Sequence, residues 1–282
     1  NQVIVIGLLA LTFISFFSLI YSHIVSDFRL INVFQNSHTS KPLIYKISGV
    51  WGNHEGSLLL WILVLTIINY FISIFYNKNN QEFISKTLQT QSIIIIGFIF
   101  FLIFTSNPFE TLDFNVENGL GFNPILQDPA LAIHPPILYL GYVGSSIIFS
   151  SVLAATSLNY ISKTWAVHIK SWILLSWVFL TIGILLGSIW AYYELGWGGF
   201  WFWDPVENIS LMPWIALTTL FHCVMVLEKR STLKTWVIIL SITTFILSMC
   251  GTFLVRSGIL NSVHTFANDP QRGLFILIFL FL

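Results

Sequence analysis

Long apolar runs constrain the fold of this chain more than any other feature of its sequence. About 20 apolar residues in helical form cross the hydrocarbon core of a bilayer. Because lipid offers the backbone no hydrogen-bond partners, such runs must be helices or strands of a closed barrel, and continuous apolarity favours helices. The sequence therefore predicts an all-α polytopic membrane protein, a bundle of about seven or eight transmembrane helices. The runs lie at 3–22, 56–76, 90–105, 132–158, 171–190, 209–227 and 235–254, and an eighth begins near Gly273.

The composition supports this fold class and excludes several functions. Only 9% of the 282 residues are charged, whereas soluble domains carry about 25%. Twelve basic and twelve acidic residues cancel, and this balance argues against a nucleic-acid-binding protein. The two cysteines, Cys223 and Cys250, lie inside apolar runs. They are interpreted as small buried hydrophobes rather than as a disulfide or a thiolate metal site.

The charges between the runs predict an orientation. Loops on one side of the predicted bundle carry seven basic residues, whereas loops on the other side carry five basic residues and ten of the twelve acids. Cytoplasmic or matrix loops of membrane proteins are enriched in Lys and Arg. The acidic side is therefore predicted to face outward, and its loops are the long ones, which are often functional. These outward loops span about 23–55, 106–133, 191–208 and 255–272.

A strip of aromatic residues fills the third outward loop. Glycines and a proline prevent a continuous helix there. Two interpretations stay open: an aromatic belt at the membrane interface, or a flat apolar platform for a large planar ligand, bounded by Asp204 and Glu207. Five of the eleven tryptophans lie in or beside the strip: Trp190, Trp197, Trp201, Trp203 and Trp214.

Two histidines in outward segments flank this strip along the sequence. His134 precedes Pro135 and Pro136, and it is therefore predicted to lie just outside the fourth helix. His264 belongs to the loop that follows the strip. Two imidazoles around an aromatic surface have the chemistry of a bis-histidine haem site. Each histidine also fits an ordinary loop position, so both interpretations stay open.

Other histidines are candidates for function. His222 lies within the sixth run, about 18 Å below its outer end at a helical rise of 1.5 Å per residue. An ionisable side chain at that depth marks a functional site, unless it is a neutral imidazole bonded to a nearby backbone carbonyl. His54 is either polarised by Glu55 or braces its loop. The remaining histidines, His23, His38 and His168, are interpreted as structural.

Several segments together resemble one family. Residues 197–208 are similar to the tryptophan-rich WWD signature of haem-handling membrane proteins. Residues 51–61, which begin Trp-Gly-Asn-His-Glu-Gly, resemble the haem lyases of cytochrome c maturation called CcmF, as do residues 133–136 and 255–267. The similarity covers nearly the whole chain, and the segment around His54 separates this family from the related CcmC and CcsA proteins.

The resemblance implies a function and a set of residue roles. It implies a cytochrome c haem lyase of the holocytochrome c synthase type, which attaches haem to the Cys-x-x-Cys-His segment of apocytochrome c. His134 and His264 match the ligands of the substrate haem. His222 matches one ligand of a resident haem b that takes electrons from quinol. The platform is assigned to Trp197, Trp201, Trp203 and Asp204, and further haem contacts to Arg256 and Trp214.

The resemblance also implies partners and a location. The partners are apocytochrome c, a CcmE-type haem chaperone, a CcmH-type thiol protein and the C-terminal half of the lyase. The chain starts at Asn1 and stops inside an apolar run. It is therefore interpreted as one partial haem-handling domain, 1–282, with its WWD-type loop at 191–210. Helices are expected to be missing at both ends, so activity is expected only with the C-terminal partner.

Alternatives remain for both location and function. A composition rich in Phe, Ile and Asn favours the mitochondrial inner membrane, with a bacterial plasma membrane as the alternative. The same aromatic strip and histidines would serve a haem carrier that presents haem to a chaperone without forming a bond. A structural subunit of a respiratory assembly would hold no haem at these histidines. A buried haem ligand at His222 favours the lyase over the carrier.

Overall fold

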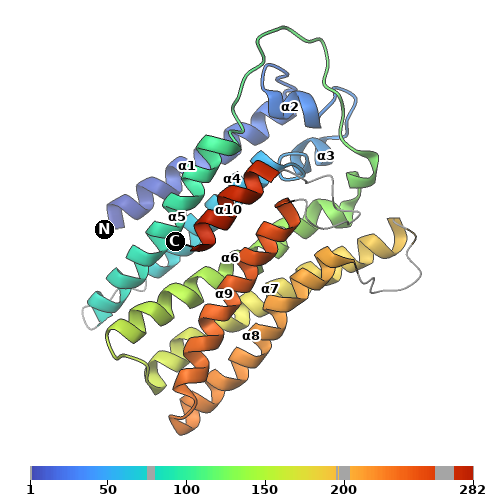
Figure 1. Ribbon diagram of the computed structural model, residues 1–282. Helices are drawn as coiled ribbons and strands as arrows, with labels where there is room; N and C mark the ends of the chain where they lie inside the picture. Colours follow the sequence, from blue (N-terminus) through green and yellow to red (C-terminus); the bar gives the residue numbers. More distant parts are fainter. Residues whose placement is uncertain (1, 75–79, 195, 197–203, 258–269, 282) are drawn as a thin grey trace.

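The chain folds into a bundle of long helices (Figure 1). The computed structural model describes residues 2–74, 80–194, 196, 204–257 and 270–281, and seven helices within them are long and apolar enough to cross a membrane. The predicted all-α polytopic membrane protein is thereby confirmed. The seven are α1 (Gln2–Ile24), α4 (His54–Ile74), α5 (Gln81–Thr105), α6 (Pro129–Ser157), α7 (Lys163–Glu194), α8 (Pro205–Arg230) and α9 (Lys234–Ser257).

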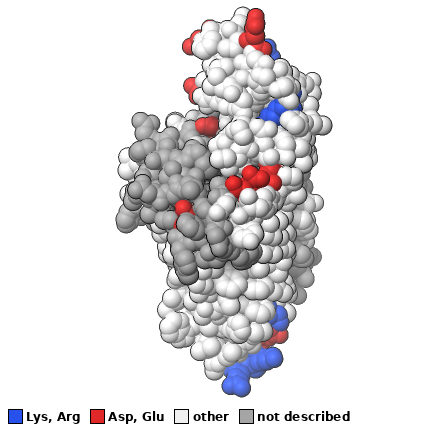
Figure 2. Space-filling view, turned by 90° about the vertical axis from the view of Figure 1, so that its right-hand side faces the viewer, with Lys and Arg blue, Asp and Glu red and all other residues white. Residues whose placement is uncertain are grey.

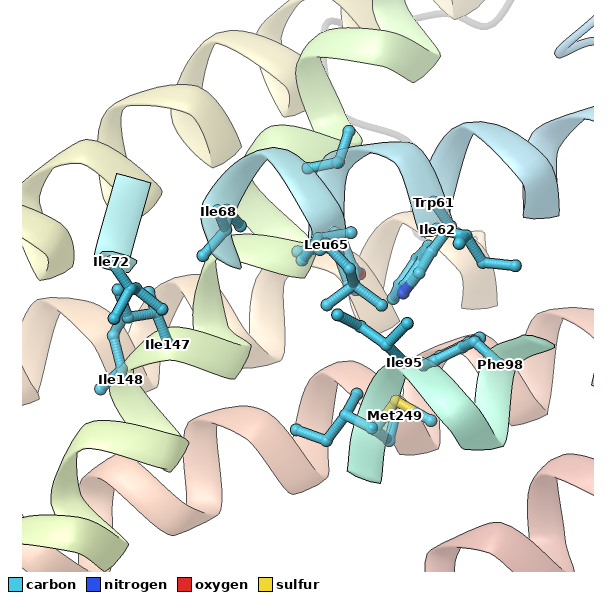
Figure 3. Close-up of a cluster of buried hydrophobic side chains, with 14 of the residues drawn as sticks. Trp61, Ile62, Leu65, Ile68, Ile72, Ile95, Phe98, Ile147, Ile148 and Met249 are labelled. Carbon is cyan, nitrogen blue, oxygen red and sulfur yellow. The ribbon is translucent and has the colours of Figure 1, made fainter. Parts of the chain in front are cut away.

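Helix α4 forms the centre of the bundle. In its most apolar stretch 78% of the residues are buried, against 22% for α1. It packs against α1, α5 and α6, and α6 continues the bundle to α7 and α9. Figure 3 shows side chains of α4, α5 and α6 meeting at its core, where the Trp61 and Phe98 rings stack at 5.4 Å. The exposed apolar faces of the outer helices are the surfaces that lipid would cover.

Two of the long outward segments, 23–55 and 106–133, fold against each other at one end of the bundle. They contain two short helices, α2 (Ile31–Asn36) and α3 (Leu43–Ser48), and a 3₁₀ turn at Pro124–Leu126. Leu30 and Thr111 form an antiparallel bridge, and the Leu120 N–H donates to the Phe34 carbonyl at 2.7 Å. In Figure 1 both segments lie at the upper end. These backbone bonds give segments without membrane helices a fixed shape above the bundle.

Basic residues outnumber acidic ones at the opposite end of the bundle. Figure 2 shows Lys and Arg side chains at the lower end of the molecule and smaller groups in its upper part, where most of the visible acidic side chains lie. Lys170 of α7 pairs with Glu228 of α8 at this end. This distribution agrees with the orientation that the loop charges predict, with α2 and α3 on the outward side.

Several helices begin before the apolar runs that predicted them; α7, for example, begins at Lys163 rather than near residue 171. Helix α5 begins at Gln81 rather than near residue 90 and is 25 residues long. Its polar first turns are helical because Glu82 and Lys86 pair across one turn at 3.8 Å and because the buried Gln91 donates to Ser146 Oγ of α6 at 3.0 Å. The polar residues at this end therefore belong to the helix. The length of the apolar run alone underestimates the length of the helix.

The prediction that His134 lies outside the fourth helix is wrong. Helix α6 begins at Pro129, and the Asp128 side chain caps it by accepting the Leu131 N–H at 3.0 Å. His134 therefore lies in the second turn. Pro136 cannot donate to the Ala132 carbonyl four residues earlier. The Trp51 indole Nε1–H donates to that carbonyl instead, at 2.9 Å, so a side chain from another segment replaces the missing helical bond.

Gly56 provides a test of how the outward segment joins α4. A Cβ on Gly56 would lie 1.7 Å from the Val50 carbonyl oxygen, so Gly56→Ala must push the 49–53 loop away from the first turn of α4. We expect a loss of about 3 kcal/mol of stability, at the upper end for overpacked sites. Thermal unfolding in detergent measures it. Gly7→Ala is the control, because its Cβ meets nothing within 4 Å; equal melting temperatures for both variants would contradict the prediction.

Candidate functional site

A cavity of about 660 Å³ opens at the outward end of the bundle. This volume lies in the range of about 300–1,000 Å³ that is usual for small-molecule and cofactor sites. Seven helices contribute to its described lining, namely the starts of α4, α6 and α8, the ends of α7 and α9, and the short helices α2 and α3, together with loop residues between 51 and 53 and between 121 and 126. Trp190 and Val206 both line it. They belong to the two helices that flank the aromatic strip in sequence, so this cavity is the candidate site.

His134 lines this cavity, and a hydrogen bond to α7 orients its imidazole. The His134 ring nitrogen Nδ1 lies 2.7 Å from the Gly183 carbonyl of α7. A carbonyl oxygen can only accept, so Nδ1 carries a proton. Metal-binding histidines are commonly oriented by such a bond to a backbone carbonyl. His134 therefore has the support that an axial haem ligand requires.

The approach of α7 to this imidazole depends on glycine. A Cβ on Gly187 would lie 2.7 Å from His134 Cε1, and a Cβ on Gly183 would lie 2.7 Å from the Leu138 Cα. The two glycines are one helical turn apart, so they form a flat stripe against which the start of α6 packs. The stripe fixes both the distance between α6 and α7 and the position of the ring.

Gly187→Ala is expected to displace the His134 ring. Its added methyl group would need the space of Cε1, while both helices could stay in place, because the contact is with a side chain alone. We expect a loss of haem affinity of about tenfold, the lower range for changes in the support of a metal ligand. Haem titration followed by absorbance measures it, with Gly7→Ala as the control. Unchanged affinity would mean that the ring position is not tuned for binding.

Another wall of the cavity carries residues 51–55. His54 and Glu55 open α4 and both line the cavity. Asn32 of α2 donates through Nδ2 to Asn53 Oδ1 at 2.8 Å and to Glu55 Oε2 at 3.3 Å. The Asn32 Oδ1 lies 2.9 Å from Nε2 of the fully buried His23. The structural interpretation of His23 is confirmed, because its ring anchors the amide that holds this wall.

The start of α8 forms a third wall. Asp204 is buried and caps the helix by accepting the Val206 N–H at 2.9 Å. Glu207 lines the cavity in the first turn of α8, and its carboxyl is hydrogen-bonded to that of Asp204. Tyr193 near the end of α7 donates its hydroxyl to Asp128 Oδ1 at 2.6 Å. The acids at 128 and 204 therefore act as helix caps on either side of the cavity.

Within the described residues, neither Lys nor Arg lines the cavity. Lys41 contacts two lining residues: its ammonium lies 3.7 Å from the centre of the Phe122 ring and donates to the Asn36 carbonyl at 3.0 Å. Burial, reinforced by the charge of Lys46, lowers the pKa of Lys41 to about 7. Phe122 and Asn36 line the cavity and separate this ammonium from it.

His222 lies far from the cavity on α8. Helix α8 starts at Pro205, so His222 lies about 25 Å below its outward end and only about 12 Å from Arg230, at 1.5 Å per residue. Its ring is exposed on the described bundle, and Nδ1 lies 2.8 Å from the Thr218 carbonyl. The carbonyl bond and a ligand role are thus compatible, because Nε2 keeps the lone pair. His222 is not among the described residues that line the cavity, so a haem at His222 would occupy a separate site.

Trp214 belongs to the contact between α7 and α8. Its indole stacks on Trp177 at 5.8 Å and donates to Thr181 at 2.8 Å, while Trp177 donates to Thr218 at 2.9 Å. Each helix therefore supplies one tryptophan and one threonine to a reciprocal clamp. Trp214 is not among the described residues that line the cavity; it fixes the helix that carries His222.

Other predicted site residues fall outside the described part of the chain. Trp197, Trp201, Trp203 and His264 belong to residues 197–203 and 258–269, which the structure does not describe. Arg256 lies in the last turn of α9, but its side chain is not described. Among the described residues, no group of three or more His, Cys, Asp or Glu side chains could hold a bare metal ion.

Sequence reasoning missed some residues that shape the site. Asn32 and Gly187 carry no motif, and their roles depend on contacts between segments far apart in the chain. The sequence did offer one signal for Asn32, a polar residue set between apolar residues near the start of the first outward loop. Nothing in the sequence around Gly187 separates it from an ordinary helix glycine.

Comparisons with known proteins identify the family. A family model described as cytochrome C assembly protein matches residues 51–260. The cytochrome c-type biogenesis protein ccl1 of Rhodobacter capsulatus is 53% identical over 97% of this chain and 42% of its own length. CcmF of Escherichia coli is 47% identical over 95% of this chain and 42% of its own length. A solved structure described as cytochrome c heme lyase CcmF is 30% identical, with a TM-score of 0.80 over 98% of this chain and 45% of that chain.

These relatives belong to the family that the sequence motifs resemble. The chain spans less than half of their length. The matched region runs from Trp51 through the cavity walls on α4, α6, α7 and α8 to Leu260. Because the family model covers most of the chain and the CcmF proteins match nearly all of it, the chain belongs to the cytochrome c assembly protein family.

Proposed function

We propose that this chain is the haem-holding part of a cytochrome c haem lyase. The observation that carries the proposal is the imidazole of His134, which lines a cavity of about 660 Å³ with its Nδ1 bonded to the Gly183 carbonyl. A ring in the cavity wall that is oriented by a backbone carbonyl suits coordination of haem iron. The names of the relatives, which are haem lyase and biogenesis proteins, agree with it.

In this proposal haem is the substrate, and the chain holds and orients it. His134 and His264 ligate its iron, and Trp197, Trp201 and Trp203 support its plane with Asp204 at their edge. Each cysteine thiol of the Cys-x-x-Cys-His segment of apocytochrome c then adds across one vinyl group. Fixing the vinyl carbon near the sulfur converts a bimolecular reaction into an effectively unimolecular one and lowers the barrier by several kcal/mol. Arg256 would contact the same haem, and Trp214 would act by fixing α8.

A resident haem b fits the position of His222. When bound, that group would supply electrons, taken from quinol, that keep the substrate iron ferrous. The chain's contribution is an imidazole fixed by the Thr218 carbonyl and exposed on α8. A second imidazole would come from the C-terminal half of the lyase, a region of the relatives that the matched residues do not cover. The other partners would be apocytochrome c, a CcmE-type haem chaperone and a CcmH-type thiol protein.

The membrane that holds this assembly stays a prediction. The relatives named above are bacterial, which fits a bacterial plasma membrane, whereas the composition favours the mitochondrial inner membrane. In either membrane the cavity opens on the side to which apocytochrome c is delivered.

A haem carrier that forms no bond is the second candidate, and tryptophan variants of the assembled lyase test both. We expect Trp201→Ala or Trp203→Ala to lower haem delivery to apocytochrome c, because each stacking ring contributes about 1 kcal/mol or more. Trp236→Ala is the matched control, because Trp236 is an exposed ring on α9. Covalent cytochrome c, measured by haem staining, should fall about fivefold or more in the platform variants alone. Equal effects at all three positions would contradict the platform, and haem bound without any covalent product would favour the carrier.

A further inference from the structure

Basic side chains gather where three helices end on the inner side of the bundle, opposite the cavity. All of them are exposed, and Figure 2 shows Lys and Arg side chains at this lower end of the molecule. We call the set the inner basic cluster. Its members are Lys163 at the start of α7, Lys229 and Arg230 at the end of α8, and Lys234 at the start of α9.

A hydrogen bond between two helix ends holds the cluster together. Lys163 Nζ donates to the Lys229 backbone carbonyl at 3.3 Å. Arg230 is the next residue along the chain, and only the turn at 231–233 separates it from Lys234. Charges from three helices therefore lie at one corner of the bundle.

The ion pairs that the structure describes at this end do not neutralise the cluster. They join Glu228 to Lys170 and Glu82 to Lys86, and neither pair includes a residue of the cluster. The first turn of α9 contains no acid, although the start of a helix carries a partial positive charge. Like charges that lie close together repel each other, so an anion from outside the chain would stabilise this corner.

The position of the cluster along the helices matches the headgroup layer of a bilayer. Helix α8 has 26 residues and is therefore about 39 Å long, whereas the hydrocarbon core is about 30 Å thick. Because charge is excluded from the core, the end with Lys229 and Arg230 reaches beyond it. About one turn further into the membrane, Val167 of α7 and Ile239 of α9 are exposed. Cations beside an exposed apolar surface suit a ligand with an anionic head and apolar chains.

We propose that the inner basic cluster binds the phosphate of one anionic phospholipid, whose acyl chains lie along α7 and α9. Each Lys or Arg near an anionic lipid surface contributes about fivefold to binding, and the acyl chains add apolar contacts that a soluble anion lacks. The bound lipid fixes the inner ends of α7 and α8 relative to each other. The outer ends of the same helices line the cavity, but the proposal does not depend on haem.

Native mass spectrometry of the full chain in detergent tests the site. The chain is titrated with phosphatidylglycerol, which is anionic, and with phosphatidylcholine, which has no net charge. We expect the unaltered chain to retain phosphatidylglycerol in preference, by about tenfold or more. The combined Lys229→Gln and Arg230→Gln variant should bind it about 25-fold more weakly, fivefold for each cation removed, and the preference for the anionic lipid should disappear.

Two control variants separate charge from other effects. Lys229→Arg combined with Arg230→Lys keeps both charges and should bind phosphatidylglycerol normally. Arg29→Gln removes a cation that is exposed at the outward end and paired with Asp27 at 2.7 Å, and it should change nothing. Phosphatidylglycerol should also raise the melting temperature of the unaltered chain, but not that of the double Gln variant. Without lipid both should melt alike, because the replaced side chains are exposed.

Four outcomes would overturn the assignment. Equal retention of both lipids by the unaltered chain, or unchanged affinity in the double Gln variant, would remove the site. An equal loss in Arg29→Gln would reduce the effect to overall charge. Inorganic phosphate that displaces the lipid at equal concentration would assign the cluster to a soluble anion. Retention of neither lipid would leave the cluster to an acidic protein segment instead.

Discussion

His134→Ala is expected to abolish retention of the outward haem and, with it, cytochrome c maturation. The variant removes a ring that lines the cavity and leaves the Gly183 carbonyl without its donor at 2.7 Å. Changes in the support of a metal ligand already cost about 10–100-fold. The loss of the ligand itself should exceed about 100-fold in haem affinity. Absorbance titration of the assembled lyase with haem measures it, and haem-stained cytochrome c gives the consequence in cells.

His38→Ala is the matched control for this experiment. His38 also lies in an outward segment, but it is half-buried, its Nδ1 contacts the Ser40 hydroxyl, and it is not among the described residues that line the cavity. Its replacement should leave haem affinity unchanged. A His134→Ala variant that retains haem and matures cytochrome c normally would remove His134 from the site.

The second large effect concerns His222 and the buried haem. Its ring is exposed on α8 of the described bundle, whereas a bis-histidine haem requires imidazoles from two facing helices. We therefore expect this chain alone to hold that haem weakly or in a five-coordinate, high-spin form. Co-expression with the C-terminal half of the lyase should produce a low-spin spectrum, and His222→Ala should abolish it.

His168→Ala provides the comparison within the membrane helices. His168 is exposed on α7 near its inner end, so its replacement should leave the low-spin spectrum intact. A stable low-spin haem in the chain alone that survives His222→Ala would contradict both the ligand assignment and the need for a partner.

The helices could be predicted from the sequence because lipid imposes one strong rule on apolar runs. Their starts could not, since polar first turns such as those around Glu82 and Asp128 are stabilised by ion pairs and caps rather than by hydrophobicity. The same limit explains the position of His134. The preference of a residue before proline for extended backbone is weaker than the capping of α6 and the replacement bond from Trp51.

Site residues could be predicted from the sequence where the residue type itself indicates the chemistry. They could not be predicted where the role depends on contacts with distant segments. His134 could be identified as a ligand candidate from its neighbours in sequence, and it lines the cavity. The support behind it comes from Gly183 and Gly187, 49 residues or more away along the chain. Trp214 shows the reverse case, because its place near the strip in sequence suggests the platform, whereas its ring packs between α7 and α8.

The bond from Trp51 to the Ala132 carbonyl has a mechanical consequence. It joins the loop before His54 and Glu55 to the helix turn that carries His134, at 2.9 Å. If either segment shifted alone, a carbonyl that proline has already deprived of its helical donor would be left unsatisfied, at a cost of about 1–3 kcal/mol. The hydrogen bond thus couples two walls of the cavity. A protein that docks on the outward loops and displaces one of these segments would also displace the other.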